Sequence, residues 1–199
     1  EEEVQAWIER TQKLSVKDRL EFFTDLKMDG LAVALWYQDG VLEKAVTRGD
    51  GFVGEVVTMN VRTIESVPTE LRKSPEFAKF LKGRTEIRGE IIMMKKDFEA
   101  LNKKREESGL ATFANPTNLA AGTIRQLDPK LVAARPLQFK GYDIIREDPE
   151  DVPTNEYAYK AIRGLGLPAN SQSQVLDSLD AVMKFANDWE EKRHDLPFH

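Results

Sequence analysis

The chain has 199 residues, of which 41% are hydrophobic and 32% are charged, and its formal net charge is −5. These values are typical of a soluble globular protein and allow one sizeable core. They exclude several classes: no apolar run nears the roughly 20 residues of a membrane span, the acidic N-terminus has no signal-peptide character, and the absence of cysteine excludes disulfides and Cys-ligated zinc in this sequence. The two histidines, His194 and His199, make a His-based metal site or a Ser-His triad a poor interpretation.

Apolar periodicity and turn residues predict the elements. Residues 1–14 predict a helix. Residues 22–46 predict a strand, a turn at Asp39-Gly40 and a returning strand. The later elements, in chain order, are a glycine-rich loop at 47–54, a strand at 85–93, a helix at 95–108, a short helix at 118–127, a strand at 137–145 and a helix at 179–192.

Charge is distributed unevenly along the chain. Residues 95–140 contain nine basic and five acidic side chains, whereas residues 146–199 contain six basic and eleven acidic ones. A basic middle between acidic flanks can form a strip that faces DNA. A solvated charged surface explains the same numbers equally well.

The segment Asp-Leu-Lys-Met-Asp-Gly at residues 25–30 holds a candidate nucleophile. If the segment is a strand, its period of two places Asp25, Lys27 and Asp29 on one face, with Leu26 and Met28 facing a core. A lysine amine can attack phosphorus only when it is unprotonated and in line with the leaving group. The alternative is a surface strand that ends in an Asp-Gly turn.

Two further segments contain candidate ligands for a nucleotide. Thr-Arg-Gly-Asp-Gly at residues 47–51 can wrap a phosphate with backbone N–H groups while Arg48 adds charge, although it is also plain turn chemistry. Arg88 and Glu90 share a face of the strand at 85–93, and Gly89 leaves room for a flat ring or ribose on the opposite side. Glu90 can accept a ribose hydroxyl or hold hydrated Mg²⁺; a cross-strand salt bridge is the alternative.

The stretch from Phe113 to Asp128 is the most distinctive. Two asparagines around a proline predict a turn and a helix cap, and the small residues Ala-Ala-Gly allow close backbone approach. Arg125 follows one to two helical turns later, within reach of a phosphate. The alternative is a tightly packed helix with a surface arginine.

Taken together, these segments resemble the adenylation (nucleotidyltransferase) domain of bacterial NAD⁺-dependent DNA ligases over nearly the whole chain. The blocks that carry the resemblance are Lys-Met-Asp-Gly-Leu-Ala-Val, Thr-Arg-Gly-Asp-Gly, Asn-Val-Arg-Thr-Ile at 60–64, Arg-Gly-Glu, Phe-Ala-Asn-Pro, Ala-Ala-Gly, Arg-Gln-Leu-Asp-Pro and Arg-Pro-Leu at 135–137. The resemblance implies that residues 1–199 form an α+β nucleotidyltransferase core, with antiparallel sheets flanked by helices around a nucleotide cleft.

The resemblance also implies roles for individual residues. Lys27 would be the adenylated nucleophile and Asp29 its electrostatic partner. The nucleotide would be bound by Asp25, Lys27, Arg48, Glu90 and Arg193, the DNA at the nick by Arg125 and Arg48, and Mg²⁺ or Mn²⁺ by Glu90. The implied chemistry transfers AMP from NAD⁺ to the lysine with release of nicotinamide mononucleotide, then to a DNA 5′-phosphate, after which a 3′-hydroxyl displaces AMP.

The chain departs from the family pattern in two residues and in extent. Asp25 replaces a glutamate, and Thr117 replaces an arginine that would add a phosphate contact. The sequence stops before the family's Asp-Gly-Val-Val-Ile-Lys strand, and no N-terminal nicotinamide-binding module, OB-fold, zinc-finger, helix-hairpin-helix or BRCT module is expected in it. We therefore expect low activity from the chain alone.

The expected partners are nicked double-stranded DNA and NAD⁺ or AMP, with no zinc and no membrane, for a monomer in the bacterial cytoplasm. Two rival functions remain open. One is an ATP-dependent nucleic-acid ligase or capping-type nucleotidyltransferase. The other is a non-catalytic remnant that binds nucleotide or DNA.

Overall fold

The computed structural model describes residues 2–14 and 20–198. The chain divides into two compact units, which are considered separately. The terminal unit consists of Glu1–Leu26 and Ser171–Leu196, and the sheet unit consists of Lys27–Asn170 and Pro197–His199. Lys27 is therefore the first residue of the sheet unit.

The terminal unit pairs two short strands and carries two helices. Its elements are α1 (Glu2–Leu14), β1 (Phe22–Thr24), β6 (Gln174–Leu176) and α7 (Leu179–Lys192). The two strands are antiparallel, with Phe23 opposite Val175. Ser178 caps α7 because its hydroxyl accepts the N–H of Ala181. The helices predicted at 1–14 and 179–192 are thus confirmed in the described residues.

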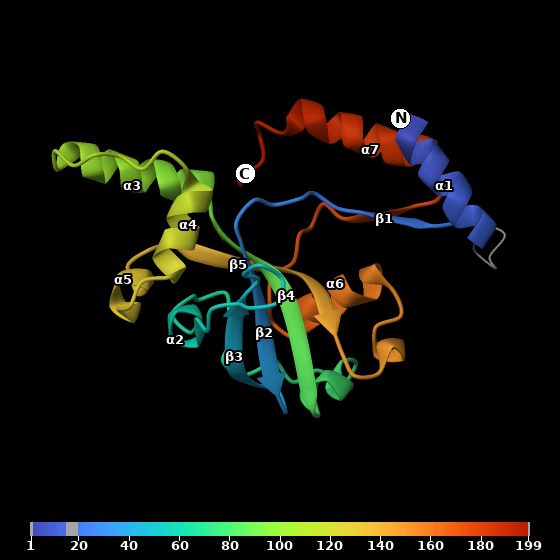
Figure 1. Cartoon of the computed structure of the whole chain (residues 1–199), viewed down its shortest axis with the longest axis horizontal. Coiled ribbons are helices and arrows are strands. Elements are labelled where there is room, and N and C mark those ends of the chain that lie inside the picture. The colour runs from blue at the N-terminus through green and yellow to red at the C-terminus, as the bar shows by residue number, and fades with distance from the viewer. Residues whose placement is uncertain (1, 15–19, 199) are drawn as a thin grey trace. The chain divides into compact units, whose positions relative to one another are not determined.

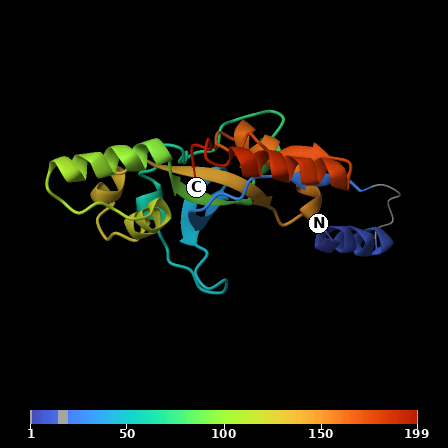
Figure 2. The ribbon, with the colours of Figure 1, turned by 90° about the horizontal axis from the view of Figure 1, so that it is seen from above.

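The sheet unit is built on four antiparallel strands in the order β3-β2-β4-β5 (Figure 1). Its elements are β2 (Leu31–Gln38), β3 (Val41–Thr47), α2 (Thr58–Val61), the 3-10 helix η1 (Ala78–Leu81), β4 (Arg84–Met93), α3 (Lys95–Glu107), α4 (Pro116–Ile124), α5 (Pro129–Ala133), β5 (Leu137–Ile145), the 3-10 helix η2 (Pro149–Asp151) and α6 (Asn155–Gly164). Both views show α3, α4 and α5 gathered at one end of this sheet (Figure 2).

The two faces of the sheet differ in burial. Leu35, Ile87 and Phe139, one from each of three neighbouring strands, are fully buried on the same face. Complete burial of such a side chain contributes about 1.5–3 kcal/mol. Helix α6 covers this face: Ile162 lies against Gly141 of β5. The opposite face keeps its side chains partly exposed and forms the floor of the site described below.

The nucleophile segment is not a strand, which corrects the sequence prediction. β1 ends at Thr24 and β2 begins at Leu31, so residues 25–30 connect them without pairing. The carboxylate of Asp25 accepts the N–H of Leu26 at 2.8 Å, a local bond that competes with strand pairing. At the other end of the segment, the backbone at Gly30 packs so tightly on Ile91 that a Cβ would collide with its carbonyl oxygen.

The structure corrects two other predictions and adds elements that were not predicted. Helix α4 begins at Pro116 rather than at 118, because Asn115 is the N-cap and accepts the N–H groups of Thr117 and Asn118. The prediction that Gly89 leaves room for a flat ring or ribose is wrong, because the ring of Phe139 already fills the space beside Gly89. Helices α2, α5 and α6 and strand β6 were not predicted, although Thr154, the N-cap of α6, is a recognisable start signal.

Candidate active site

The open face of the sheet forms the floor of a cavity of about 430 Å³. Residues of β2, β3, β4, β5 and the glycine-rich loop line it. They include Ala32, Trp36, Arg48, Arg88 and Tyr142. A cavity of this size falls within the range of small-molecule sites.

Four charged side chains predicted from the sequence converge at one end of this face. Lys27 and Asp29 are exposed, whereas Met28 between them is 4% exposed, so the predicted alternation holds locally although the segment is not a strand. The charges of Lys27, Asp29 and Arg48 all act on the carboxyl group of Glu90, on β4. The structure therefore brings Lys27, Asp29, Arg48 and Glu90 together.

Glu90 has an unusual environment. Burial raises the pKa of its carboxyl group to about 7; Lys27 and Arg48 oppose this shift, and Asp29 reinforces it. Its Oε2 atom is buried and has no hydrogen-bond partner among the described residues. Arg88, on the same strand, pairs with Glu86 instead: its Nε donates to Oε1 of Glu86 at 2.8 Å. A buried oxygen without a partner is costly, and it marks a place for a ligand's hydrogen-bond donor.

The glycine-rich loop is held by its own hydrogen bonds. Gly49 and Gly51 have φ angles of 56° and 97°, which side-chain-bearing residues rarely adopt. Oδ1 of Asp50 accepts the N–H groups of Phe52 and Val53 at 2.9 and 2.8 Å. These donors are thus already used, and the N–H groups of Asp50 and Gly51 bond to loop carbonyls. These bonds favour the plain-turn alternative for the loop, and the Arg48 side chain is what the loop offers to an anion.

A β-bulge in β5 adds site residues that the sequence reasoning missed. Arg88 lies opposite Asp143, but Gly89 lies opposite Gly141, so Tyr142 is the extra residue. Both Tyr142 and Asp143 line the cavity. Burial raises the pKa of both side chains. The alternation of polar residues along 137–145 could have indicated Tyr142; the bulge had no recognisable signal.

Helix α4 brings a second set of residues to this region. The hydroxyl of Thr117 donates to Oδ2 of Asp29 at 3.1 Å, so a neutral hydrogen-bond donor sits where the family pattern has an arginine. Arg125 follows α4, and its Nε donates to Oε2 of Glu55 at 2.7 Å. Both members of this ion pair are largely exposed, which leaves Arg125 accessible to an anion.

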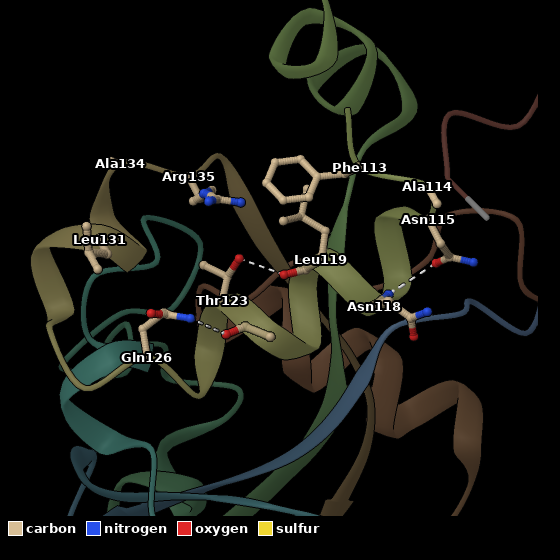
Figure 3. A pocket seen from close by; sticks show the side chains of 11 residues that line it. Phe113, Ala114, Asn115, Asn118, Leu119, Thr123, Gln126, Leu131, Ala134 and Arg135 are labelled. Atoms are coloured by element: carbon tan, nitrogen blue, oxygen red, sulfur yellow. Dashed lines mark hydrogen bonds between the residues drawn. The ribbon is translucent and has the colours of Figure 1, made fainter. Parts of the chain in front are cut away.

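On another side of α4 lies a second cavity, of about 510 Å³, which the sequence did not predict (Figure 3). Its lining combines α4, α5 and the segment before α4. Two guanidinium groups lie over the ring of Phe113, with Cζ of Arg105 4.4 Å and Cζ of Arg135 4.9 Å from its centre. Burial, reinforced by the charge of Arg105, lowers the pKa of Arg135. This is a cation–π arrangement.

Two predicted nucleotide ligands, Asp25 and Arg193, belong to the terminal unit and remain predictions. No group of three or more His, Cys, Asp or Glu side chains that could hold a metal ion occurs in the described ranges. Within residues 2–14 and 20–198, no helix combines the length and the apolar character needed to cross a membrane.

The mixed α/β fold with antiparallel sheets and helices is that of the nucleotidyltransferase class. The family model of the NAD-dependent DNA ligase adenylation domain matches residues 1–199, and the chain belongs to this family. It is 45% identical over 197 residues to a DNA ligase of Thermomicrobium roseum, an alignment that covers 98% of this chain and 28% of the relative. DNA ligases of Koribacter versatilis and Methylococcus capsulatus are 42% and 41% identical, and in each case all of this chain matches 29% of the relative. The chain thus spans less than a third of these relatives' length.

Proposed function

We propose that this chain performs the lysine-adenylation chemistry of an NAD⁺-dependent DNA ligase. The Lys27 amine attacks the adenylate phosphorus of NAD⁺ and forms a nitrogen–phosphorus bond, while the bond to the bridging oxygen breaks and nicotinamide mononucleotide leaves with that oxygen. AMP then passes to a DNA 5′-phosphate, and a 3′-hydroxyl displaces it to seal the nick. The observation that carries the proposal is the convergence of Lys27, Asp29 and Arg48 on the carboxyl group of Glu90, whose Oε2 atom has no hydrogen-bond partner among the described residues.

Each of these groups has a proposed task in adenylation. The free Oε2 atom of Glu90 accepts a ribose hydroxyl, and the ring of Tyr142 offers a flat surface to the base. Arg48 offsets the negative charge that develops on the phosphate. Asp29 stabilises the Lys27 ammonium before the amine loses its proton. Asp25 and Arg193 are proposed as further nucleotide contacts.

Magnesium is proposed as a participant, with Mn²⁺ as a substitute. The two carboxylates near Lys27, those of Asp29 and Glu90, are too few to form a complete cage. They suit Mg²⁺, which usually keeps several waters and takes one or two carboxylates together with phosphate oxygens. When bound, the ion would withdraw charge from the phosphate oxygens.

For the DNA steps, we propose that Arg125 and Arg48 contact phosphates at the nick. Arg125 is exposed, and its present partner is a single exposed carboxylate, which an entering phosphate can displace. We further propose that the protein is a monomer and acts in the bacterial cytoplasm.

Intact-mass measurement tests the first step. The chain is incubated with Mg²⁺ and NAD⁺, and separately with Mg²⁺ and ATP. Partial conversion to a species heavier by one AMP, with NAD⁺ alone, is the expected result, in keeping with the low activity expected of the chain by itself. A gain with ATP alone would instead identify an ATP-dependent ligase or capping-type enzyme. No gain with either, together with nick binding that is unaffected by loss of Lys27, would indicate a non-catalytic binding protein.

A further inference from the structure

The side chain of Asn60, in α2, is buried away from the cavity yet connects to Arg125. It is 8% exposed. Its Nδ2 atom donates to the carbonyl oxygen of Ile124 at 2.6 Å and to that of Gln126 at 2.7 Å. These carbonyl groups belong to the residues immediately before and after Arg125. One amide group therefore holds the backbone on both sides of Arg125.

Asparagine suits this task chemically. The last carbonyl groups of a helix lack partners within the helix, and α4 ends at Ile124. A side-chain amide nitrogen has two N–H donors, a hydroxyl has one, and an ionised carboxylate has none. Asn60 can therefore bond to two orphan carbonyl groups at once, whereas aspartate in its place would set a negative charge against both oxygens.

Helix α2 is itself fastened to the sheet. The N–H of Val57 donates to the carbonyl of Ala45 at 2.9 Å, and the N–H of Ala45 donates to the hydroxyl of Thr58 at 3.0 Å. Ala45 lies in β3 and is fully buried. The position of Asn60, and through it the chain at Arg125, is thus set by the sheet.

The guanidinium group of Arg125 is also held in place from β3, through Glu55. Its ion-pair partner, Glu55, exchanges two hydrogen bonds with Thr47 at the end of β3. The N–H of Thr47 donates to the Glu55 carbonyl, and the N–H of Glu55 donates to the Thr47 hydroxyl, both at 2.9 Å. The connection from β3 to α2 therefore fixes Arg125 at its backbone and at its guanidinium group.

We propose that Asn60 is a positioning residue that sets Arg125 in place to receive a nucleic-acid phosphate. The proposal rests on the DNA-binding role of Arg125 given under the proposed function. A long side chain that is fixed in advance loses less conformational freedom when it binds. Loss of Asn60 should therefore resemble loss of Arg125, although Asn60 lies out of reach of the DNA.

The salt dependence of binding to nicked duplex DNA tests this proposal, because the slope of log K against log salt changes by about 0.9 for each phosphate contact. In the 199-residue chain, Arg125→Ala should make the slope shallower by about one. Asn60→Ala should do the same, and the double variant should lose nothing further. The control is Thr85→Val, which removes another buried hydroxyl, one that donates to the Phe80 carbonyl and accepts from Nη1 of Arg146, and it should leave the slope unchanged.

A second measurement needs no DNA. The Arg125 Nε–H resonance, identified by its absence in Arg125→Lys, should be slow to exchange because it donates to Glu55. Asn60→Ala should shift the resonance and speed its exchange, Asn60→Ser should have an intermediate effect because one donor remains, and Thr85→Val should have none. Asn60→Ser also serves if the alanine variant does not fold.

The outcomes separate the two proposals. If Arg125→Ala changes the slope and Asn60→Ala does not, or if their effects add, the positioning role is wrong. If Arg125→Ala leaves the slope unchanged, or the chain does not bind nicked DNA, the DNA role of Arg125 fails and the inference falls with it. An unchanged Nε–H resonance in Asn60→Ala would also overturn the positioning role.

Discussion

Burial raises the pKa of the Glu90 carboxyl group well above the ordinary value of a carboxylic acid. In the unfolded chain its pKa would be near 4.3, whereas burial raises the folded-state pKa to about 7. Between these values the folded protein keeps a proton that the unfolded chain has released. The free energy of unfolding therefore falls as pH rises from about 4.5 to about 7, and it stays reduced above that range.

Glu90→Gln removes this titration. Because Glu90 is only half-buried, solvent screening reduces its contribution to about 1 kcal/mol, or about 2–4 °C in melting temperature for a chain of this size. We expect the variant to melt above the unsubstituted protein at pH 8 and close to it at pH 5. Thermal melts at both values measure this, and a constant difference across them would refute the assignment.

Lys27→Ala should abolish covalent AMP while leaving the melting temperature nearly unchanged, because the exposed side chain contributes little to the core. Intact mass after incubation with NAD⁺ and Mg²⁺ measures the adenylate. Lys103→Ala, which removes an exposed lysine of α3, is the matched control and should keep the label. A labelled Lys27→Ala protein would exclude Lys27 as the nucleophile.

Arg125→Ala should weaken nicked-DNA binding several-fold, because it removes one charge-assisted phosphate contact. Its adenylation should stay close to that of the unsubstituted chain. Binding by fluorescence anisotropy and adenylation by intact mass measure the two effects side by side. An equal loss in both would contradict the proposed separation between adenylation and DNA contact.

At the scale of elements, the contact between β4 and β5 is unusually close. A Cβ atom at Gly89 would collide with the ring of Phe139 and with the carbonyl oxygen of Lys140. The two strands can pair here only because residue 89 has no side chain. Glycine at this position is thus required by the packing behind the site.

Gly89→Ala should destabilise the protein by about 1–3 kcal/mol, the usual cost of overfilling a core. Phe139→Leu should relieve part of the clash, so the double variant should lose less than the sum of the single losses. Gly122→Ala is the control, since its Cβ would meet nothing within 4 Å, and it should be neutral or stabilising. Urea unfolding measures all four; strictly additive losses would rule out the collision.

The sequence predicted elements well where one periodicity dominates. The strand at 137–145 and the helix at 179–192 have the predicted bounds, and the strand at 85–93 is one residue longer. The strand predicted at 25–30 is wrong: Lys27, Met28 and Asp29 alternate in exposure as expected, but the local bond of Asp25 competes with strand pairing and the segment is unpaired. The sequence analysis also missed α6, although Thr154 and the apolar residues after it signal a helix.

The site residues, like the elements, were predicted where a local sequence pattern marks them and were missed where no such pattern exists. The grouping of Lys27, Asp29, Arg48 and Glu90 came from motifs recognised together rather than from any one of them. Contacts between segments far apart in the chain were invisible to the sequence. Asn60 is the clearest example, because its partners lie 64 and 66 residues away.

At the scale of the whole molecule, the two units differ in the extent of the strand pairing that stabilises each of them. Among the residues that the structure describes, the sheet unit has four paired strands with a buried face, whereas the terminal unit pairs two strands of three residues each. A two-stranded ribbon is marginally stable in water. Local opening should therefore cost less in the terminal unit.

Hydrogen–deuterium exchange measures this difference. Amides of β1 and β6 should exchange well before those of β2 and β4. Addition of urea below the main unfolding transition should widen the gap. Equal protection in the two units would show that they open as one cooperative body.

The bulge at Tyr142 has a consequence for how this domain can change over evolutionary time. In a regular strand, neighbouring residues face opposite sides, so a shift of one position exchanges core and surface. Here the additional residue gives β5 two adjacent positions, Tyr142 and Asp143, that both line the cavity, while Gly141 and Ile144 remain buried. Substitutions at these two positions can therefore alter what the cavity recognises while the hydrophobic interior behind it stays the same.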